Sequence, residues 1–282
     1  MEIFRLEDKI TTEYSGHHQL SRFYHFGMGL PQGSEIQLDF TEAEWFDGNL
    51  CALLWAVAYV LKKNFGHLIS TDEIEIKNRF DILFRNGFLR TGEVILDNRK
   101  SAVPIQDFDC SDKEGFCKYV NDELLSHRGM PALGKDLKDK IMEDLLEVFC
   151  NSQHHAGTSD PIFVGGQYYP KQRVLKFTMV DVGDGFLPRV NKATNGKIGS
   201  NLDAILWALQ GNSTKLFFDK CPGGLGIKNM YKYCKENGGV LQIISNDGFW
   251  SSDLEGTIFE GGRVLKAPFI GITINLIFRK DL

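Results

Sequence analysis

The stretch from Lys140 to His155, KIMEDLLEVFCNSQHH, decides the fold of the second half of the chain. It predicts one helix, because its apolar residues recur at intervals of three and four. These apolar residues are Ile141, Leu145, Val148 and Phe149. A second stripe of Asp144, Glu147 and Asn151 runs beside them, and residues four apart on a helix are neighbours. A carboxylate and a carboxamide placed together can orient a water molecule and ligate a hard cation, and the alternative is a solvated helix edge.

The composition is that of a globular protein. The chain has 282 residues, enough for two domains, with 43% hydrophobic and 24% charged residues. Its net charge of -5 argues against nucleic-acid binding, which usually leaves a basic footprint. The longest apolar run, residues 50–61, is too short to span a bilayer, and the first residues do not resemble a signal peptide. The six cysteines include no C-x-x-C pair, so we expect no zinc site, no disulfide framework and a cytoplasmic location.

A second motif follows a predicted strand. Residues 174–182, VLKFTMVDV, are rich in β-branched and aromatic residues, and their apolar members alternate. The alternation places Asp181 on the core-facing side, where a carboxylate needs a donor such as an adenine amino group. Gly183 and Gly185 then remove side chains at a point where a ligand can approach closely. The alternative is an ordinary turn that contains acidic residues.

A third motif, Gly224-Leu225-Gly226, precedes a segment with apolar residues at helical spacing, so these glycines are predicted to open a helix. Backbone N–H groups at a helix N-terminus attract an anion, and glycine leaves them accessible. The segment is not a P-loop, because no Gly-Lys-Ser or Gly-Lys-Thr follows. The alternative is that the glycines serve close packing alone.

In this order the three motifs resemble the nucleotide boxes of the GHKL ATPase superfamily, which includes gyrase-type topoisomerases, heat-shock chaperones and histidine kinases. The resemblance covers roughly residues 135–282. It implies a domain of residues 109–282 that folds as a two-layer α/β sandwich, with a mixed sheet and helices on one face. It also implies ATP and Mg²⁺ as ligands. By this resemblance Asn151 ligates Mg²⁺, Glu147 orients or deprotonates a water, and Asp181 binds the adenine.

The resemblance assigns further contacts to the nucleotide. Besides Asn151 and Asp181, the residues implied are Gly183, Gly185, Ser213, Thr214, Lys215, Gly224, Leu225, Gly226 and Thr273. Thr273 stands one residue away from the threonine of the family's usual Gly-Thr pair. Residues 186–221 are expected to form a mobile lid with a short amphipathic helix at 204–209, and the alternative is a fixed surface loop.

The first part of the chain predicts a smaller α/β unit, preceded by an N-terminal extension of residues 1–34. Residues 35–40 alternate polar and apolar side chains as a half-buried strand does. Asp47 or Asn49 can cap the Leu-rich helix that follows. Residues 101–112 are polar and contain a proline, which predicts a linker.

This unit, residues 35–108, resembles the STAS domains of bacterial anti-sigma-factor antagonists. The strand, the Phe46-Asp47 corner and the Leu-rich helix carry the resemblance. Those antagonists have a phosphorylated serine after the aspartate, whereas Gly48 and Asn49 occupy its place here. Docking is therefore the expected role of the unit, and the alternative is a structural cap without a partner of its own.

The expected fold class of the whole chain is α+β. Its closest likeness is to anti-sigma serine kinases, which implies a Mg-ATP-binding regulatory protein that hydrolyses ATP slowly or phosphorylates serine or threonine of a partner. The alternative is a non-catalytic module whose protein contacts depend on bound nucleotide. We expect ATP and a regulatory protein as partners, and a homodimer is compatible with them. We expect neither nucleic acid nor membrane as a partner.

Overall fold

The structure is a computed structural model that describes residues 1–89, 96–155, 160–213, 226–254 and 261–280. Helices and strands are mixed along the chain, which confirms the expected α+β class. Among the helices in these ranges, none is both long and apolar enough to cross a membrane.

The first 71 residues form a β-α-β-α-β unit. Its strands are β1 (Glu2–Ile10), β2 (Glu35–Phe46) and β3 (Leu68–Thr71). They pair in parallel in the order β1-β2-β3. Its helices are α1 (Tyr14–Met28), the short 3-10 helix η1 (Gly48–Leu50) and α2 (Cys51–Phe65). Residues 1–34, expected as an extension, supply β1 and α1 and so belong to this sheet and its helical layer.

Two short helices, α3 (Glu73–Arg79) and α4 (Ile82–Arg85), follow the third strand. Asp72 caps α3, because its side chain accepts the N–H groups of Ile74 and Glu75. Helix α4 is capped at its C-terminus by Asn86, and Gly87 follows with a positive φ of 80°.

The rest of the chain forms a seven-stranded sheet in which every described pairing is antiparallel, so the predicted mixed sheet is wrong. In spatial order its strands are β4 (Ala102–Phe108), β5 (Ile162–Tyr169), β6 (Val174–Asp181), β10 (Ile272–Arg279), β7 (Val240–Ser245), β8 (Gly248–Ser251) and β9 (Gly262–Val264). Because β4 occupies most of residues 101–112, the predicted linker is wrong. Pro104 is compatible with a strand here because β4 is an edge strand and its pairing with β5 is irregular between Val103 and Gln106.

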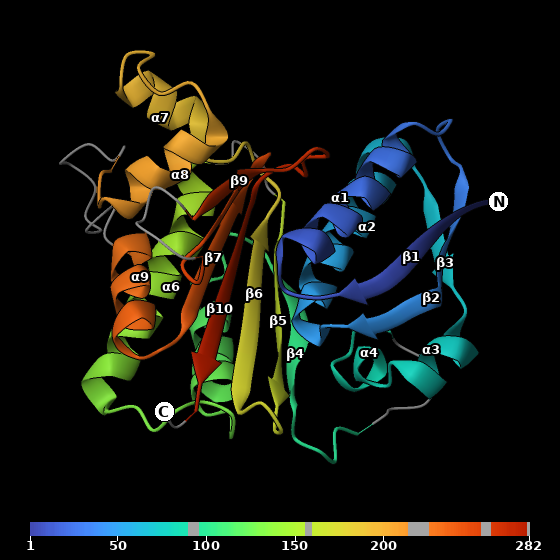
Figure 1. Cartoon of the computed structure of the whole chain (residues 1–282), viewed down its shortest axis with the longest axis horizontal. Helices are drawn as coiled ribbons and strands as arrows, with labels where there is room; N and C mark the ends of the chain where they lie inside the picture. The colour runs from blue at the N-terminus through green and yellow to red at the C-terminus, as the bar shows by residue number, and fades with distance from the viewer. Residues whose placement is uncertain (90–95, 156–159, 214–225, 255–260, 281–282) are drawn as a thin grey trace.

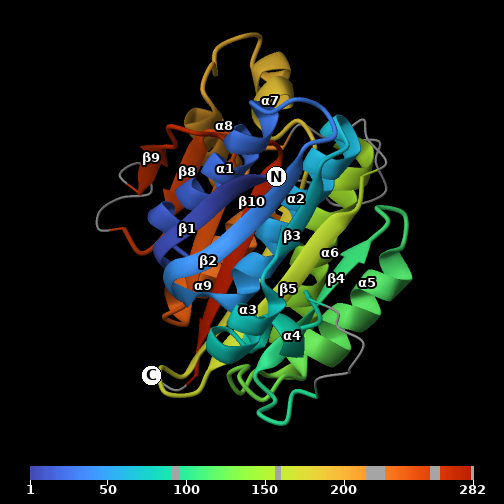
Figure 2. The same cartoon turned by 90° about the vertical axis from the view of Figure 1, so that its right-hand side faces the viewer.

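Helices cover both faces of this large sheet (Figures 1 and 2). On one face lie α5 (Lys113–Tyr119), the π-helix η2 (Val120–Leu125), α6 (Lys135–His155), α8 (Asn201–Leu209) and α9 (Gly226–Glu236). On the other face lie α1 and α2, which separate the large sheet from the three-stranded sheet. Helices α7 (Leu187–Ala193) and α8 lie at the upper end of the sheet in Figure 1, where β6 ends.

Each face of the large sheet has its own hydrophobic core. The core under α6 contains the four residues predicted for the apolar face of that helix, Ile141, Leu145, Val148 and Phe149. The core on the opposite face runs from the three-stranded sheet through α1 and α2 to Ile105, Phe163 and Val180 of the large sheet. The N-terminal unit is therefore packed onto the large sheet through a continuous core.

Candidate functional site

The polar stripe of α6 faces the beginning of α9. Asp144 is buried and Glu147 is half-buried. The Gly226 N–H donates to Glu147 Oε2 over 3.0 Å, and Asn229 Nδ2 donates to Asp144 Oδ1 over 3.0 Å. These bonds join the two helices, so the structure brings the first predicted motif together with the last residue of the third.

Close packing explains why Gly226 opens α9. A Cβ atom at this position would lie 3.1 Å from both the Asp144 carbonyl oxygen and Glu147 Oε2. Such contacts are tighter than side chains normally make, so a larger residue would require Glu147 or the α6 backbone to shift by a few tenths of an ångström. The glycine therefore allows its own N–H group to reach the Glu147 carboxylate.

Burial raises the pKa of Asp144 from its ordinary 3.8 to about 6. This pKa already includes smaller raising effects of the nearby Glu147 and Glu143 carboxylates and the opposing effects of the hydrogen bond from Asn229 and the charge of Lys140. Between these two pH values the folded protein holds a proton that the unfolded chain has lost. The contribution of Asp144 to stability is therefore complete below pH 3.8 and is lost as the pH rises through 6.

Asp144→Asn is expected to stabilise the protein at neutral pH, because it removes a buried charge and keeps an acceptor for Asn229. Allowing for solvent screening, we expect a gain of about 1–2 kcal/mol in the free energy of unfolding near pH 8. The gain should be roughly half as large near pH 5. Urea unfolding of both proteins at the two pH values measures it, and a gain independent of pH would contradict the assignment.

Asp181 ends β6 on the sheet face that α6 and α9 cover. Phe177 and Met179 lie in the core beneath these helices, as the alternation predicts for that face. The Gly183 N–H donates to Asp181 Oδ1 over 2.7 Å, so the carboxylate also closes the turn after the strand.

Two glycines let the backbone approach this turn closely. Gly185 has a φ of +80°, and a Cβ there would lie 2.4 Å from Asn246 Nδ2 and 2.7 Å from Ser245 Oγ. Gly271 has a φ of +85°, and a Cβ there would lie 1.9 Å from the Asp181 carbonyl oxygen. Side chains are thus excluded on both sides of the Asp181 turn.

The structure does not bring every predicted residue to this place. Thr273 is buried and pairs with Val180, whose side chain lies in the core that faces α1 and α2. Because side chains alternate along a strand, Thr273 and Asp181 lie on opposite faces of the sheet. Ser213 is exposed beyond the end of α8. Thr214, Lys215, Gly224 and Leu225 lie outside the described residues.

The predicted lid is described only in part. Within residues 186–221 the structure has α7 and α8, and the helix predicted at 204–209 is confirmed as part of α8. Ser200 caps α8 by accepting the Asp203 N–H. The inner face of α8 is buried through Ala204 and Ile205. Movement of this segment stays a prediction.

Asn151 offers a ligand for a hard cation. Its Oδ1 atom is buried and accepts no hydrogen bond within the described part of the chain. A buried amide oxygen without a donor is costly, and Mg²⁺ binds oxygen ligands. Among the described residues, no three His, Cys, Asp or Glu side chains cluster as a metal site. A Mg²⁺ ion here would therefore also need phosphate oxygens, and Mg²⁺ in nucleotide sites usually has them.

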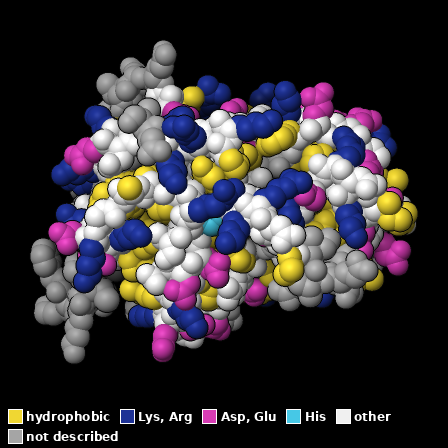
Figure 3. Space-filling view, turned by 90° about the horizontal axis from the view of Figure 1, so that it is seen from below, with side chains coloured by type: hydrophobic (Ala, Val, Ile, Leu, Met, Phe, Trp, Pro, Cys, Tyr) yellow, Lys and Arg dark blue, Asp and Glu magenta, His cyan; other side chains and the backbone are white. Residues whose placement is uncertain are grey.

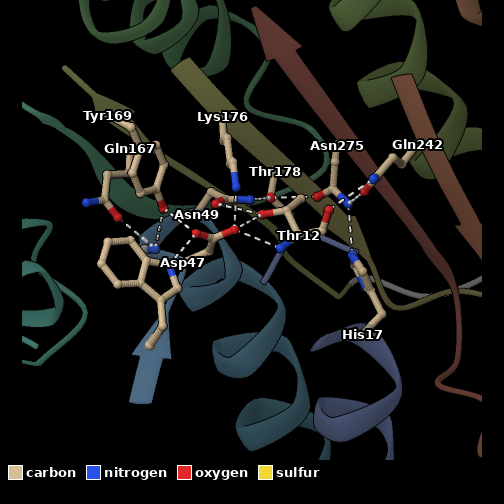
Figure 4. A network of polar contacts seen from close by, with 12 residues as sticks. Thr12, His17, Asp47, Asn49, Gln167, Tyr169, Lys176, Thr178, Gln242 and Asn275 are labelled. Atoms are coloured by element: carbon tan, nitrogen blue, oxygen red, sulfur yellow. Dashed lines mark hydrogen bonds and ion pairs between the residues drawn. The ribbon is translucent and has the colours of Figure 1, made fainter. Parts of the chain in front are cut away.

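A second polar centre lies on the opposite face of the sheet, around Asp47, which is 1% exposed (Figure 4). Asp47 Oδ2 accepts the N–H and the hydroxyl of Thr12, each over 2.7 Å, and lies 2.6 Å from Lys176 Nζ. Asp47 Oδ1 accepts Trp45 Nε1–H and the Tyr169 hydroxyl, each over 2.8 Å. Burial by itself raises the pKa of Asp47, but the Lys176 charge and these donors outweigh it and lower the pKa below its ordinary value.

The network continues across the large sheet through Asn49. Its Nδ2 donates to Thr178 Oγ1 over 2.7 Å, and the Thr178 hydroxyl donates to Asn275 Oδ1 over 2.7 Å. Asn275 Nδ2 then contacts Gln242 Oε1 at 3.0 Å and His17 Nε2 at 2.8 Å. Burial lowers the pKa of His17 to about 3, so this imidazole is neutral and accepts from Asn275.

Sequence reasoning missed this centre. The helix cap expected from Asp47 or Asn49 is wrong, because neither side chain accepts a cap hydrogen bond for η1 or α2. Asp47 instead accepts from Thr12, Trp45, Tyr169 and Lys176, and most of these donors are distant in the sequence. One usable signal is present in β6, where Lys176 and Thr178 alternate with buried apolar residues. A polar residue at such a position in a strand covered on both faces needs a partner.

No protein-family model, curated protein or solved structure matches the chain. What the chain does is therefore inferred from its own residues.

Proposed function

We propose that this chain is a Mg-ATP-binding regulatory protein of the GHKL type, which hydrolyses ATP slowly or transfers its phosphoryl group to serine or threonine of a partner protein. The observation that carries the proposal is the hydrogen bond from Gly226 to Glu147, because it joins the first and third ordered motifs. Asp181, of the second motif, ends β6 on the sheet face that α6 and α9 cover.

Each residue has a separate role in this proposal. Asp181 would accept the adenine amino group at the end of β6. Asn151 would give its unpaired Oδ1 to Mg²⁺, which neutralises phosphate charge when it is bound. Glu147 would orient or deprotonate the attacking water or hydroxyl. Gly226 would keep α9 close enough to α6 for these groups to act together.

The large sheet differs from the finer fold that the resemblance implies, because its described pairings are all antiparallel and helices pack on both of its faces. One of those faces supports the proposal. Helices α5, α6, α8 and α9 lie on one face of the large sheet, as in a two-layer sandwich. In this proposal the N-terminal unit is a STAS-like docking element held on the other face. Its Asp47-Gly48-Asn49 corner is buried, and the Gly48 N–H donates to Gln167 Oε1 over 2.8 Å. A phosphorylation switch at this corner is therefore not part of the proposal.

Nucleotide binding tests the proposal. Wild type should bind Mg-ATP in calorimetric titration, and Asp181→Asn should weaken binding roughly ten- to a hundredfold, the equivalent of about 1.5–3 kcal/mol for a charged hydrogen bond. Asparagine keeps an acceptor for the Gly183 N–H, so the turn should persist. Asp184→Asn, an exposed carboxylate in the same turn, should change the affinity less than about twofold. Absence of binding by wild type, or equal affinities in all three proteins, would refute the adenine site.

A non-catalytic nucleotide-gated module is the second candidate, and the Glu147 contact favours it. Glu147 Oε2 already accepts a backbone N–H, so this carboxylate also stabilises the start of α9. Replacing Glu147 would therefore change the packing of α9 on α6 as well as the activation of the water. Formation of ADP from Mg-ATP over hours distinguishes the two candidates. Turnover supports the enzyme, and tight binding without turnover supports the module.

A further inference from the structure

Six basic residues gather at the end of the large sheet opposite Asp181. They are Lys100, Arg128, Lys171, Arg173, Arg279 and Lys280, and together we call them the basic end. Lys280 is half-buried and the other five are exposed. Figure 3 shows this end of the molecule, with Lys and Arg side chains gathered around its centre. The eight residues of β6 separate it from Asp181 by roughly 25 Å.

Hydrogen bonds hold the basic end together across four segments that are distant in the sequence. Arg128 Nε donates to the Lys100 carbonyl over 2.8 Å, and Lys280 Nζ donates to the Arg128 carbonyl over 2.9 Å. The Lys280 N–H donates to the Arg173 carbonyl over 2.8 Å. The Arg128 guanidinium also lies over the Tyr168 ring, 5.3 Å from its centre. The cations are therefore held on a defined framework.

Within the residues that the structure describes, the cations of the basic end have no carboxylate partners. Arg5, Arg79 and Arg85, by contrast, each pair with an acidic residue. Uncompensated like charges repel one another, so their assembly at one end favours an anionic ligand.

The backbone conformation at two residues of the basic end also supports an anionic ligand. Five non-glycine residues of the described structure have a positive φ, and three of them are Asp or Asn, which tolerate it best. The other two are Lys100, with a φ of 46°, and Arg173, with a φ of 55°. Because the Cβ atom of residues other than Gly, Asn and Asp disfavours this conformation, its occurrence at two basic residues of one surface points to a role for their side chains.

We infer that the basic end binds a carboxylate-rich segment of a partner protein. The guanidinium groups of Arg128, Arg173 and Arg279 match the geometry of carboxylates. The whole chain has a net charge of -5 and the basic end contributes +6, so the remaining residues together carry -11. A long nucleic acid or a membrane leaflet would extend beyond the basic end and meet this net negative charge, whereas a short acidic segment would not.

Fluorescence anisotropy with a labelled oligoglutamate peptide tests the inference on the full chain. Wild type should bind the peptide with an affinity that falls as salt is added. Lys100→Asn/Arg173→Asn should weaken binding roughly tenfold, for the loss of two ion pairs. Asparagine tolerates a positive φ, so this variant should keep its thermal midpoint. Lys171→Ser/Arg279→Ser, which changes exposed residues only, should weaken binding to a similar extent.

Matched controls separate a specific surface from general charge. Lys113→Asn/Lys118→Asn removes two exposed charges from α5 and should leave the peptide affinity unchanged. The inference is overturned if this control weakens binding as much as the other variants, or if wild type does not bind the peptide. Tighter binding of an oligothymidine or of phosphatidylserine vesicles at the same ionic strength would also overturn it, in favour of those ligands.

Discussion

Asp47→Ala is expected to lower the free energy of unfolding by about 3–5 kcal/mol, the cost of breaking a buried ion pair from one side. The substitution leaves Lys176 without its anion, and the donors of Thr12, Trp45 and Tyr169 lose their acceptor. These donors come from the N-terminal unit and from the large sheet, so we expect the contact between the two to weaken first. Urea unfolding and amide exchange in α1 and α2 measure the two effects.

Glu42→Ala is the matched control, on strand β2, which ends directly before Asp47. Glu42 pairs with Arg5 at the surface, where both side chains are about half exposed, at 57% and 47%. Its loss should cost less than about 1 kcal/mol. Adding Lys176→Met to Asp47→Ala should recover part of the lost stability, because it removes the uncompensated charge. Equal losses in Asp47→Ala and Glu42→Ala would show that the buried network does not hold the units together.

Gly271→Ala is expected to cost roughly 3–4 kcal/mol and to abolish nucleotide binding, because two penalties add at one position. The new Cβ would lie 1.9 Å from the Asp181 carbonyl oxygen, and the residue has a φ of +85°. Either β10 or the end of β6 must move, and both movements displace the Asp181 turn. Thermal unfolding and Mg-ATP titration of the folded variant are the measurements.

Gly33→Ala separates backbone strain from the steric clash. Gly33 has a similar φ of +74°, but no atom lies within 4 Å of a Cβ placed there. Alanine at this position should cost only about 1 kcal/mol and leave nucleotide affinity unchanged. If the two alanine variants lose the same stability, contact with Asp181 is not what requires Gly271.

Local periodicity was sufficient for the elements that carry the proposed site. The spacing in α6 correctly indicates its buried face, and the alternation in β6 correctly places Phe177 and Met179 under the helices. The glycine motif correctly marks the start of α9. These signals can be read in the sequence because each depends on which side of one element is buried.

The periodicity of a helix or strand does not identify which elements cover its buried face. For a strand, it also does not identify which other strand pairs with it. Residues 101–112 look polar in isolation, yet β4 is formed there because it pairs with β5, about sixty residues later in the chain. The resemblance placed Thr273 near the nucleotide, yet its register against Val180 directs it away from Asp181.

By itself, then, the amino-acid sequence determined the α+β class, the α6, β6 and α9 elements and the polar residues that they present. Only the tertiary structure decided the partners of those residues. Asp47 looked like a helix cap because its nearest backbone donors are local, but Thr12, Tyr169 and Lys176 reach it from segments up to 129 residues away. Hydrogen bonds and ion pairs depend on proximity in space, and long-range packing creates that proximity after local patterns have chosen the elements.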